Sequence, residues 1–327
     1  MKLNKTNNKN FILKEAVIAI TYRCNSRCRM CNIWQKENHG DEIKVRDFFN
    51  LPARLKDINI TGGEPFLRED LGEIIQAIKK RCPGAGIVIS SNGLATDLVI
   101  RQVKSILKFD PNIGIAISID GLGRAHDDVR GVQGAYGQAV ETIQELKRIG
   151  VKNLKIAFTI GDYNYTELSG VYDLSKELRT EFSLAAVHSS KNYFGKENKI
   201  ARKEEIAEQL DWLVGKELSG WDYKRWARAY FTYGLKEFLL TGKRILPDYS
   251  GKLNIFIDPC GDIYPCDVSG EKIGSLGKAN KETKFSRGNL VSGECGNSWM
   301  ICTARQAIKK HWFRAGRWIL ENKFLKI

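Results

Sequence analysis

Short apolar runs alternate along the chain with segments that carry apolar residues at every third or fourth position. The runs are nearly continuous in apolar, β-branched residues, as expected for strands covered on both faces. They span 16–21, 57–61, 87–91, 113–120, 154–160 and 182–188. Helical periodicity lies between them, over 71–80, 96–107, 138–149 and 167–178. This alternation of strand and helix predicts parallel βα units.

Six such units predict an α/β fold, a partial (β/α)6 TIM-like barrel rather than a closed barrel of eight units. In barrels of this kind the functional site forms at the carboxyl ends of the strands. A cysteine-rich loop follows the first predicted strand, and Gly62-Gly63-Glu64-Pro65 follows the second. Ser91-Asn92 ends the third, and Ser118 lies near the end of the fourth. We therefore expect these motifs to meet at one rim.

The pattern changes after the sixth strand. An amphipathic helix is predicted over 201–218 and an aromatic-rich one over 221–240, followed by short strands at 253–257 and 263–264. We expect five segments. They are a polar extension over 1–14, the barrel over 15–195, a helical linker over 196–245, a smaller cysteine-bearing domain over 246–304 and a basic tail over 305–327.

The sequence pattern indicates in which cellular compartment the protein is expected. Residues 1–14 are polar and lack the apolar stretch of a signal peptide. No run of about 18 apolar residues occurs that could span a membrane. We therefore expect a cytoplasmic protein, in which eight cysteines indicate metal ligation before disulfides.

The formal net charge is +14. A solvated surface accounts for such a charge, and phosphate-bearing or lipid partners are the alternatives. No nucleic-acid partner is expected, because no zinc-finger, RRM-like or helix-turn-helix signature occurs.

Cys24, Cys28 and Cys31 form the most informative motif. Three thiolates can hold three irons of a 4Fe–4S cluster and leave the fourth iron without a protein ligand. An electron carrier uses four thiolates, whereas an open iron can bind a substrate or cofactor. The spacing therefore favours a cluster at which chemistry takes place.

Cys-x3-Cys-x2-Cys after a first strand, followed by Gly-Gly-Glu-Pro after the second, resembles the radical S-adenosylmethionine (SAM) superfamily. The resemblance implies that Cys24, Cys28 and Cys31 ligate a 4Fe–4S cluster whose open iron binds SAM. It further implies reductive cleavage of SAM to a 5′-deoxyadenosyl radical, which abstracts a hydrogen atom from a substrate. Such an enzyme needs an electron donor such as ferredoxin or flavodoxin.

The same resemblance implies contacts to SAM. Gly62-Gly63-Glu64-Pro65 looks like the motif that binds the SAM amino group, since glycines let the backbone approach and Glu64 or free carbonyls can accept from an ammonium. The alternative is a plain strand-to-helix connection.

Further SAM contacts are implied at four positions. Ser118 and Arg130 resemble positions that contact the SAM carboxylate or ribose; the alternatives are a capping serine and a surface arginine. Asn92 is expected near the ribose or in a simple turn, and Met30 beside adenine.

A second group of cysteines lies in the C-terminal part of the chain, at Cys260, Cys266, Cys295 and Cys302. Gly261 to Cys266 resembles the Gly-x4-Cys start of the SPASM/twitch extensions of radical SAM enzymes. This implies one auxiliary 4Fe–4S cluster held by the four thiolates. A four-thiolate zinc site is the alternative, because Zn²⁺ accepts the same ligands.

No catalytic acid or base stands out. His188 ends the sixth predicted strand and is either a structural hydrogen-bonder or a group that reaches the substrate. Asp258 and Asp267 flank the auxiliary cysteines and are candidate bases. Cys82, beside Pro83, is expected to be structural.

The tail over 305–327 carries seven Lys or Arg residues and one Glu. At helical spacing, Ile308, Trp312, Ala315 and Ile319 share a face. Such a helix packs on the barrel or lies on an anionic lipid surface, which would make the protein peripheral to a membrane.

The substrate class stays open between a peptide or protein and a sugar or lipid-linked small molecule. About 14 residues precede the first predicted strand, so we expect no leader-binding domain fused there. The alternative function is a non-enzymatic iron–sulfur electron carrier or a zinc-stabilised scaffold. The Gly-Gly-Glu-Pro motif argues against that alternative, because a carrier needs no SAM pocket.

Overall fold

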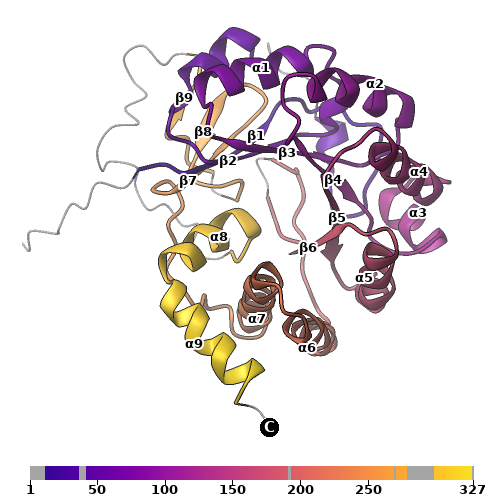
Figure 1. The fold of residues 1–327 in the computed structure, drawn as a ribbon, viewed down its shortest axis with the longest axis vertical. Helices are drawn as coiled ribbons and strands as arrows, with labels where there is room; N and C mark the ends of the chain where they lie inside the picture. Colours follow the sequence, from indigo (N-terminus) through magenta and orange to yellow (C-terminus); the bar gives the residue numbers. More distant parts are fainter. Residues whose placement is uncertain (1–11, 37–41, 191–192, 269, 278–297, 326–327) are drawn as a thin grey trace, which may run out of the picture.

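The computed structural model describes residues 12–36, 42–190, 193–268, 270–277 and 298–325. In these residues the strands form one sheet in the order β6-β5-β4-β3-β2-β1-β7-β8-β9. Figure 1 shows strands β1–β6 arranged as an arc with helices α1–α5 along its outer side. The six-unit partial barrel predicted from the sequence is confirmed.

The strands of the described chain are β1 (Glu15–Ala19), β2 (Asp57–Thr61), β3 (Gly86–Ser91), β4 (Gly114–Ser118), β5 (Asn153–Ile160), β6 (Glu181–Ala186), β7 (Asn254–Ile257), β8 (Asp262–Tyr264) and β9 (Gly274–Ser275). The helices are α1 (Leu71–Arg81), α2 (Thr96–Leu107), α3 (Arg124–Arg130), α4 (Ala135–Arg148), α5 (Leu168–Glu177), α6 (Lys203–Ser219), α7 (Tyr223–Thr241), α8 (Ile301–Lys310) and α9 (Trp312–Lys323). Neighbouring strands from β6 to β7 pair in parallel.

The apolar pattern forms the core. Ile60, Ile89 and Ile117 come from three adjacent strands and have no exposed surface. Outer helices cover the sheet with one apolar face each, as Ile74 and Ile78 do on α1. Periodicity located these elements because burial on one face repeats with the period of the backbone.

Several predicted boundaries were wrong. The strands predicted over 113–120 and 182–188 end earlier, at Ser118 and Ala186, because the chain turns into the loops that line the rim. Helix α3 was not predicted at all. The single tail helix expected to align Ile308 with Ile319 is two helices, since the backbone breaks at His311 (φ −109°, ψ 37°).

The C-terminal strands extend the barrel sheet. Strand β7 pairs in parallel with β1 from Glu15↔Asn254 to Ile18↔Ile257, and β8 and β9 follow in antiparallel order. One continuous sheet therefore contains strands from both the predicted barrel and the predicted smaller domain. This pairing satisfies the backbone groups of β1 that β2 leaves free.

No helix in the described part of the chain has the length and apolarity required to cross a membrane.

Candidate functional site

A cavity of about 240 Å³ lies at the carboxyl ends of the barrel strands. We call it the cysteine cavity. Sequence-predicted site residues that line it are Cys24, Cys28, Met30, Cys31, Gly62, Gly63, Asn92, Ser118 and Arg130. The expectation that these motifs meet at one rim agrees with this placement.

Backbone N–H groups of the loop after β1 contact two of the three thiols. The N–H of Ser26 donates to Cys24 Sγ at 3.4 Å, and the N–H of Ile33 donates to Cys31 Sγ at 3.4 Å. The loop is tied to the end of α3, because the Arg27 N–H donates to the Arg130 carbonyl at 2.9 Å. Residues far apart in sequence thus fix the thiols at the cavity wall.

Burial controls the charge of these thiols. Desolvation raises the pKa of Cys24 to about 11 and that of Cys31 to about 12. Both would be neutral near pH 7 in the absence of a metal, because a dehydrated thiolate is unfavourable. A bound iron reverses this preference, since a coordinating thiol is deprotonated.

The donor set is three thiols that line a shared cavity. A 4Fe–4S cluster takes each thiolate on a different iron, so the residues present fit such a cluster.

Gly62 and Gly63 let the turn after β2 approach the cysteine loop closely. A Cβ atom on Gly63 would lie 2.2 Å from the Arg23 carbonyl oxygen, and one on Gly62 would lie 2.5 Å from that of Thr21. Gly62 also has φ +151°. The Gly63 N–H donates to the Thr21 carbonyl at 2.8 Å. Only glycine fits this backbone contact.

Glu64 lies behind the cavity wall. Its Oε2 accepts from the Asn92 N–H at 2.7 Å, and its Oε1 accepts from the Phe66 N–H at 3.2 Å. The side chain joins the loops after β2 and β3, and burial raises its pKa to about 7. Pro65 is buried and begins the short 3-10 helix Pro65–Leu67.

Arg130 is buried, so the surface-arginine alternative is wrong. Its Nη2 lies 2.6 Å from Asp120 Oδ2, and its Nη1 donates to Cys28 Sγ at 3.5 Å. Asp120 is held in turn by the Thr159 N–H, which donates to Oδ1 at 2.7 Å. A fixed positive charge therefore lies beside the cysteine loop.

Several residues at this site were not predicted. The Tyr193 hydroxyl donates to the Gly62 carbonyl at 3.1 Å, and Asn198 Nδ2 donates to the Met30 carbonyl at 3.0 Å. Ser26 Oγ donates to the Arg130 carbonyl at 2.9 Å. No local signal marks Tyr193 or Asn198, because the long loop after β6 brings Asn198 to the cavity and Tyr193 to the Gly62 carbonyl. Ser26 lies inside the cysteine motif, whose spacing is the signal that could have found it.

His188 lines both the cysteine cavity and an adjoining cavity of about 330 Å³. Its Nε2 lies 3.1 Å from Asp267 Oδ2. Burial alone would lower the imidazole pKa, but the Asp267 carboxylate outweighs it and the pKa is raised. His188 therefore lies between the two cavities and is held there by Asp267.

The C-terminal cysteines are dispersed over different elements. Cys260 is exposed in the turn between β7 and β8, Cys266 is buried after β8, and Cys302 lies in the first turn of α8. Cys295 lies outside the described residues. Cys266 is disulfide-bonded in this structure, so a shared metal site for the four cysteines, which requires Cys266 in its reduced form, stays a prediction. Cys82 is buried and donates to the Pro52 carbonyl at 3.3 Å, in keeping with the expected structural role.

Comparison with known proteins finds that the barrel is similar to one enzyme superfamily. The model of the radical SAM superfamily matches residues 18–174. The mycofactocin maturase MftC of Mycolicibacterium smegmatis is 24% identical over 291 residues, which cover 86% of this chain and 68% of that protein. The Fe-coproporphyrin III synthase of Methanosarcina barkeri is 29% identical over 164 residues, 48% of this chain and 40% of that protein.

A third relative is the sporulation killing factor maturation protein SkfB of Bacillus subtilis, 26% identical over 161 residues, which cover 48% of this chain and 38% of that protein. The matches to SkfB and to the M. barkeri synthase thus span less than half of those relatives' length.

The solved structure of native anSMEcpe with bound AdoMet superposes with a TM-score of 0.60 at 17% identity, covering 92% of this chain and 87% of that one. This likeness supports the fold. Residues 18–174, just under half of this chain, are therefore similar to the radical SAM superfamily of enzymes.

Proposed function

We propose that this chain abstracts a hydrogen atom from a substrate by the radical chemistry of SAM. The observation that carries the proposal is that Cys24, Cys28 and Cys31 line one cavity with the Gly62–Gly63 turn and Arg130. When bound, the 4Fe–4S cluster and SAM supply the electron and the 5′-deoxyadenosyl radical that takes the hydrogen atom. The cavity beside the thiols favours this enzyme over an electron carrier.

The protein's part is to position these groups and exclude water. The three cysteines ligate the cluster, and the Gly62–Gly63 backbone faces the SAM amino group. Glu64 and Pro65 do not contact SAM directly in this proposal. They support the cavity wall, since the Glu64 carboxylate fixes the loop of Asn92.

The other cavity-lining residues are proposed SAM contacts. Ser118 and Arg130 are assigned to the SAM carboxylate or ribose, Asn92 to the ribose and Met30 to the adenine. Arg130 also helps to position Cys28, because the guanidinium donates to that sulfur.

The adjoining cavity is the proposed substrate entrance. It shares Ala186, Val187, His188 and Asn198 with the cysteine cavity. Its remaining wall is mostly apolar and comes from α7 and the segment before α8. Its further lining residues are Ser189, Ile200, Lys203, Leu235, Phe238, Leu239, Gly242, Val268, Ser298, Trp299 and Met300. A substrate held there would present its reacting group next to the cysteine cavity.

Two relatives are named as a maturase and a maturation protein. We therefore favour a precursor peptide or protein as the substrate class. A sugar or lipid-linked small molecule is the second candidate, supported by the basic tail. Reduced ferredoxin or flavodoxin is the proposed electron donor.

We also propose an auxiliary 4Fe–4S cluster on Cys260, Cys266, Cys295 and Cys302, in a SPASM/twitch-like region. The similarity to MftC supports it, because that match extends over 291 residues and so beyond the barrel. A zinc ion on the same thiols is the competing assignment.

The tail surface supports contact with anionic lipid. Phe313 and Leu320 on α9 and Phe324 at its C-cap are 72%, 56% and 42% exposed and lie at helical spacing. Ala315 and Trp318 on the opposite face pack into the core. Arg314 and Arg317 flank the exposed stripe, so an anionic bilayer fits it in both charge and apolarity.

Anaerobic reconstitution with iron and sulfide, followed by SAM and dithionite, tests the proposed activity. We expect 5′-deoxyadenosine from the wild type and none above background from Cys24→Ala. Cys82→Ala is the matched control, since that thiol lies outside the cavity. Equal yields from wild type and Cys24→Ala would contradict the proposal.

A further inference from the structure

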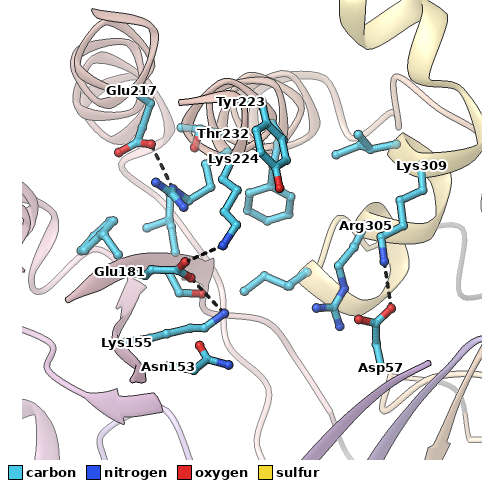
Figure 2. Close-up of a pocket in the computed structure, with 18 of the residues that line it drawn as sticks. Asp57, Asn153, Lys155, Glu181, Glu217, Tyr223, Lys224, Thr232, Arg305 and Lys309 are labelled. Carbon is cyan, nitrogen blue, oxygen red and sulfur yellow. Dashed lines mark hydrogen bonds and ion pairs between the residues drawn. The ribbon is translucent and has the colours of Figure 1, made fainter. Parts of the chain in front are cut away.

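The barrel contains a larger cavity, of about 740 Å³, at the opposite end of the sheet from the cysteine cavity. We call it the basal cavity. Asp57, Asn153 and Glu181, at the amino ends of β2, β5 and β6, form one side of it. Figure 2 shows α7 and α8 on the other sides, with charged side chains pointing inward. Its volume is typical of small-molecule pockets.

Apolar side chains form much of its wall. Phe182 and Leu184 on β6 and Leu213 on α6 are almost fully buried beside it. Phe231 on α7 and Ile308 on α8 line it from the helical side. These surfaces give an apolar body a place to bind out of water.

Positive charge exceeds negative charge around this cavity. The charged lining residues are Lys152, Lys155, Lys224, Arg228, Arg305 and Lys309 against Asp57, Glu181 and Glu217. Glu181 is shared by two lysines, with Lys155 Nζ at 3.1 Å and Lys224 Nζ at 3.4 Å.

Glu217 is likewise shared, by Arg228 at 3.0 Å and Arg225 at 3.7 Å. One carboxylate cannot neutralise two cations, so a positive surplus remains at both places.

The pKa values of two acidic side chains agree with this surplus of positive charge. Burial would raise the pKa of Asp57 and of Glu181, yet both pKa values are lowered because Lys309 and Arg305 act on the first, and Lys155 and Lys224 on the second. Both carboxylates are held ionised in a locally positive field.

We propose that the basal cavity binds a small amphipathic anion, a carboxylate or phosphate monoester on an apolar body. The head group contacts Lys155 and Lys224, and the body lies against Phe182 and Phe231. The cavity contains none of the thiols or the Gly62–Gly63 turn, so this ligand does not compete with SAM. The site is independent of the reaction proposed at the other end of the barrel.

Titration calorimetry on the anaerobically reconstituted full-length chain tests the site. The probes are octanoate and octyl phosphate. Octanol, which has the apolar chain without a charge, and inorganic phosphate, which has the charge without an apolar chain, are the controls. We expect saturable binding of one or both anionic probes, and the tighter one identifies the head group. Octanol or inorganic phosphate binding as tightly as the amphipathic probes would overturn the proposal.

Two variants locate the binding. Lys155→Met/Lys224→Met should weaken it by at least about tenfold, the loss expected for charge-assisted contacts. Lys104→Met/Lys108→Met removes the same charge from the exposed side of α2 and should bind as the wild type does.

Ala227→Trp fills the cavity mouth without changing charge and should abolish binding while circular dichroism and SAM binding are retained. Unchanged affinity in Ala227→Trp would overturn the proposal even if the lysine variant fails to fold.

Discussion

The guanidinium of Arg130 is held by the carboxylate of Asp120, with Nη2 and Oδ2 2.6 Å apart in a buried ion pair. Asp120 follows β4 and Arg130 ends α3, and the Thr159 N–H on β5 fixes the carboxylate. The pair therefore joins two barrel strands to the helix that contacts the cysteine loop. It also presents a permanent positive charge to Cys28.

Replacing Asp120 by Asn should lower the free energy of unfolding by about 3 kcal/mol, because it leaves the Arg130 charge buried without its partner. Urea denaturation followed by circular dichroism measures this. Asp128→Asn is the control, since Asp128 and Arg124 form an exposed pair, and it should change stability by less than about 0.5 kcal/mol. Equal effects of the two substitutions would mean that the buried pair contributes no more than a surface one.

Stability should fall in acid because of His126. The buried imidazole accepts from the Asp120 N–H at 3.0 Å, and desolvation together with Arg130 lowers its pKa from 6.5 to about 3. Between these values the unfolded chain binds a proton that the folded chain does not. Stability is therefore complete above pH 6.5 and is lost as pH falls towards 3, by up to about 5 kcal/mol.

His126→Asn tests this, because Asn Oδ1 can accept the same N–H without titrating. Its unfolding free energy should depend less on pH than that of the wild type, measured by urea denaturation across the acidic range. His311→Asn, at a half-buried histidine whose pKa is lowered less than that of His126, should change the slope less than His126→Asn does. If His126→Asn retains the wild-type slope, His126 does not cause the acid sensitivity.

Gly63→Ala should disrupt the cysteine loop, because its Cβ would lie 2.2 Å from the Arg23 carbonyl oxygen. We expect a reconstituted protein with less cluster absorbance and less iron. Gly137→Ala is the matched control, as nothing lies within 4 Å of its added Cβ on α4. It should leave iron content unchanged and stabilise the helix by about 0.5–1 kcal/mol. Normal iron in Gly63→Ala would contradict the steric argument.

Metal analysis separates the two proposals for the C-terminal cysteines. The wild type should contain about eight irons, and Cys24→Ala/Cys28→Ala/Cys31→Ala about four, if an auxiliary 4Fe–4S cluster is present. One zinc and no iron in the triple variant would instead assign a zinc site. Cys302→Ala in the same background should remove whichever metal remains, and retention of the metal would exclude Cys302 as a ligand.

Vesicle sedimentation tests the lipid contact of α9. The wild type should sediment with vesicles that contain phosphatidylglycerol and much less with phosphatidylcholine alone, because the exposed stripe is flanked by arginines. Phe313→Ser/Leu320→Ser should abolish sedimentation, whereas Phe49→Ser/Leu122→Ser, which removes two exposed apolar side chains elsewhere, should not. Equal loss in both variants would remove the support for a specific contact by α9.

Local pattern was enough to find the barrel. The predicted strand at 57–61 and helix at 96–107 match β2 and α2 to the residue, because a short run of β-branched residues marks the first and a helical period marks the second. The cysteine spacing likewise marked Cys24, Cys28 and Cys31 before any fold was known. Helix α3 was missed, since it is a single short helix of seven residues in a glycine-rich stretch.

The sequence by itself determined the order of the βα units and the chemical identity of the rim, because both are set by neighbouring residues. Only the tertiary structure decided that β7 completes the edge of β1, that Glu64 holds the loop of Asn92, and that Arg130 is buried against Asp120. Each of these contacts joins segments that are separated along the chain. Such contacts depend on which surfaces meet when the core packs, and the local sequence pattern does not predict which distant segments those are.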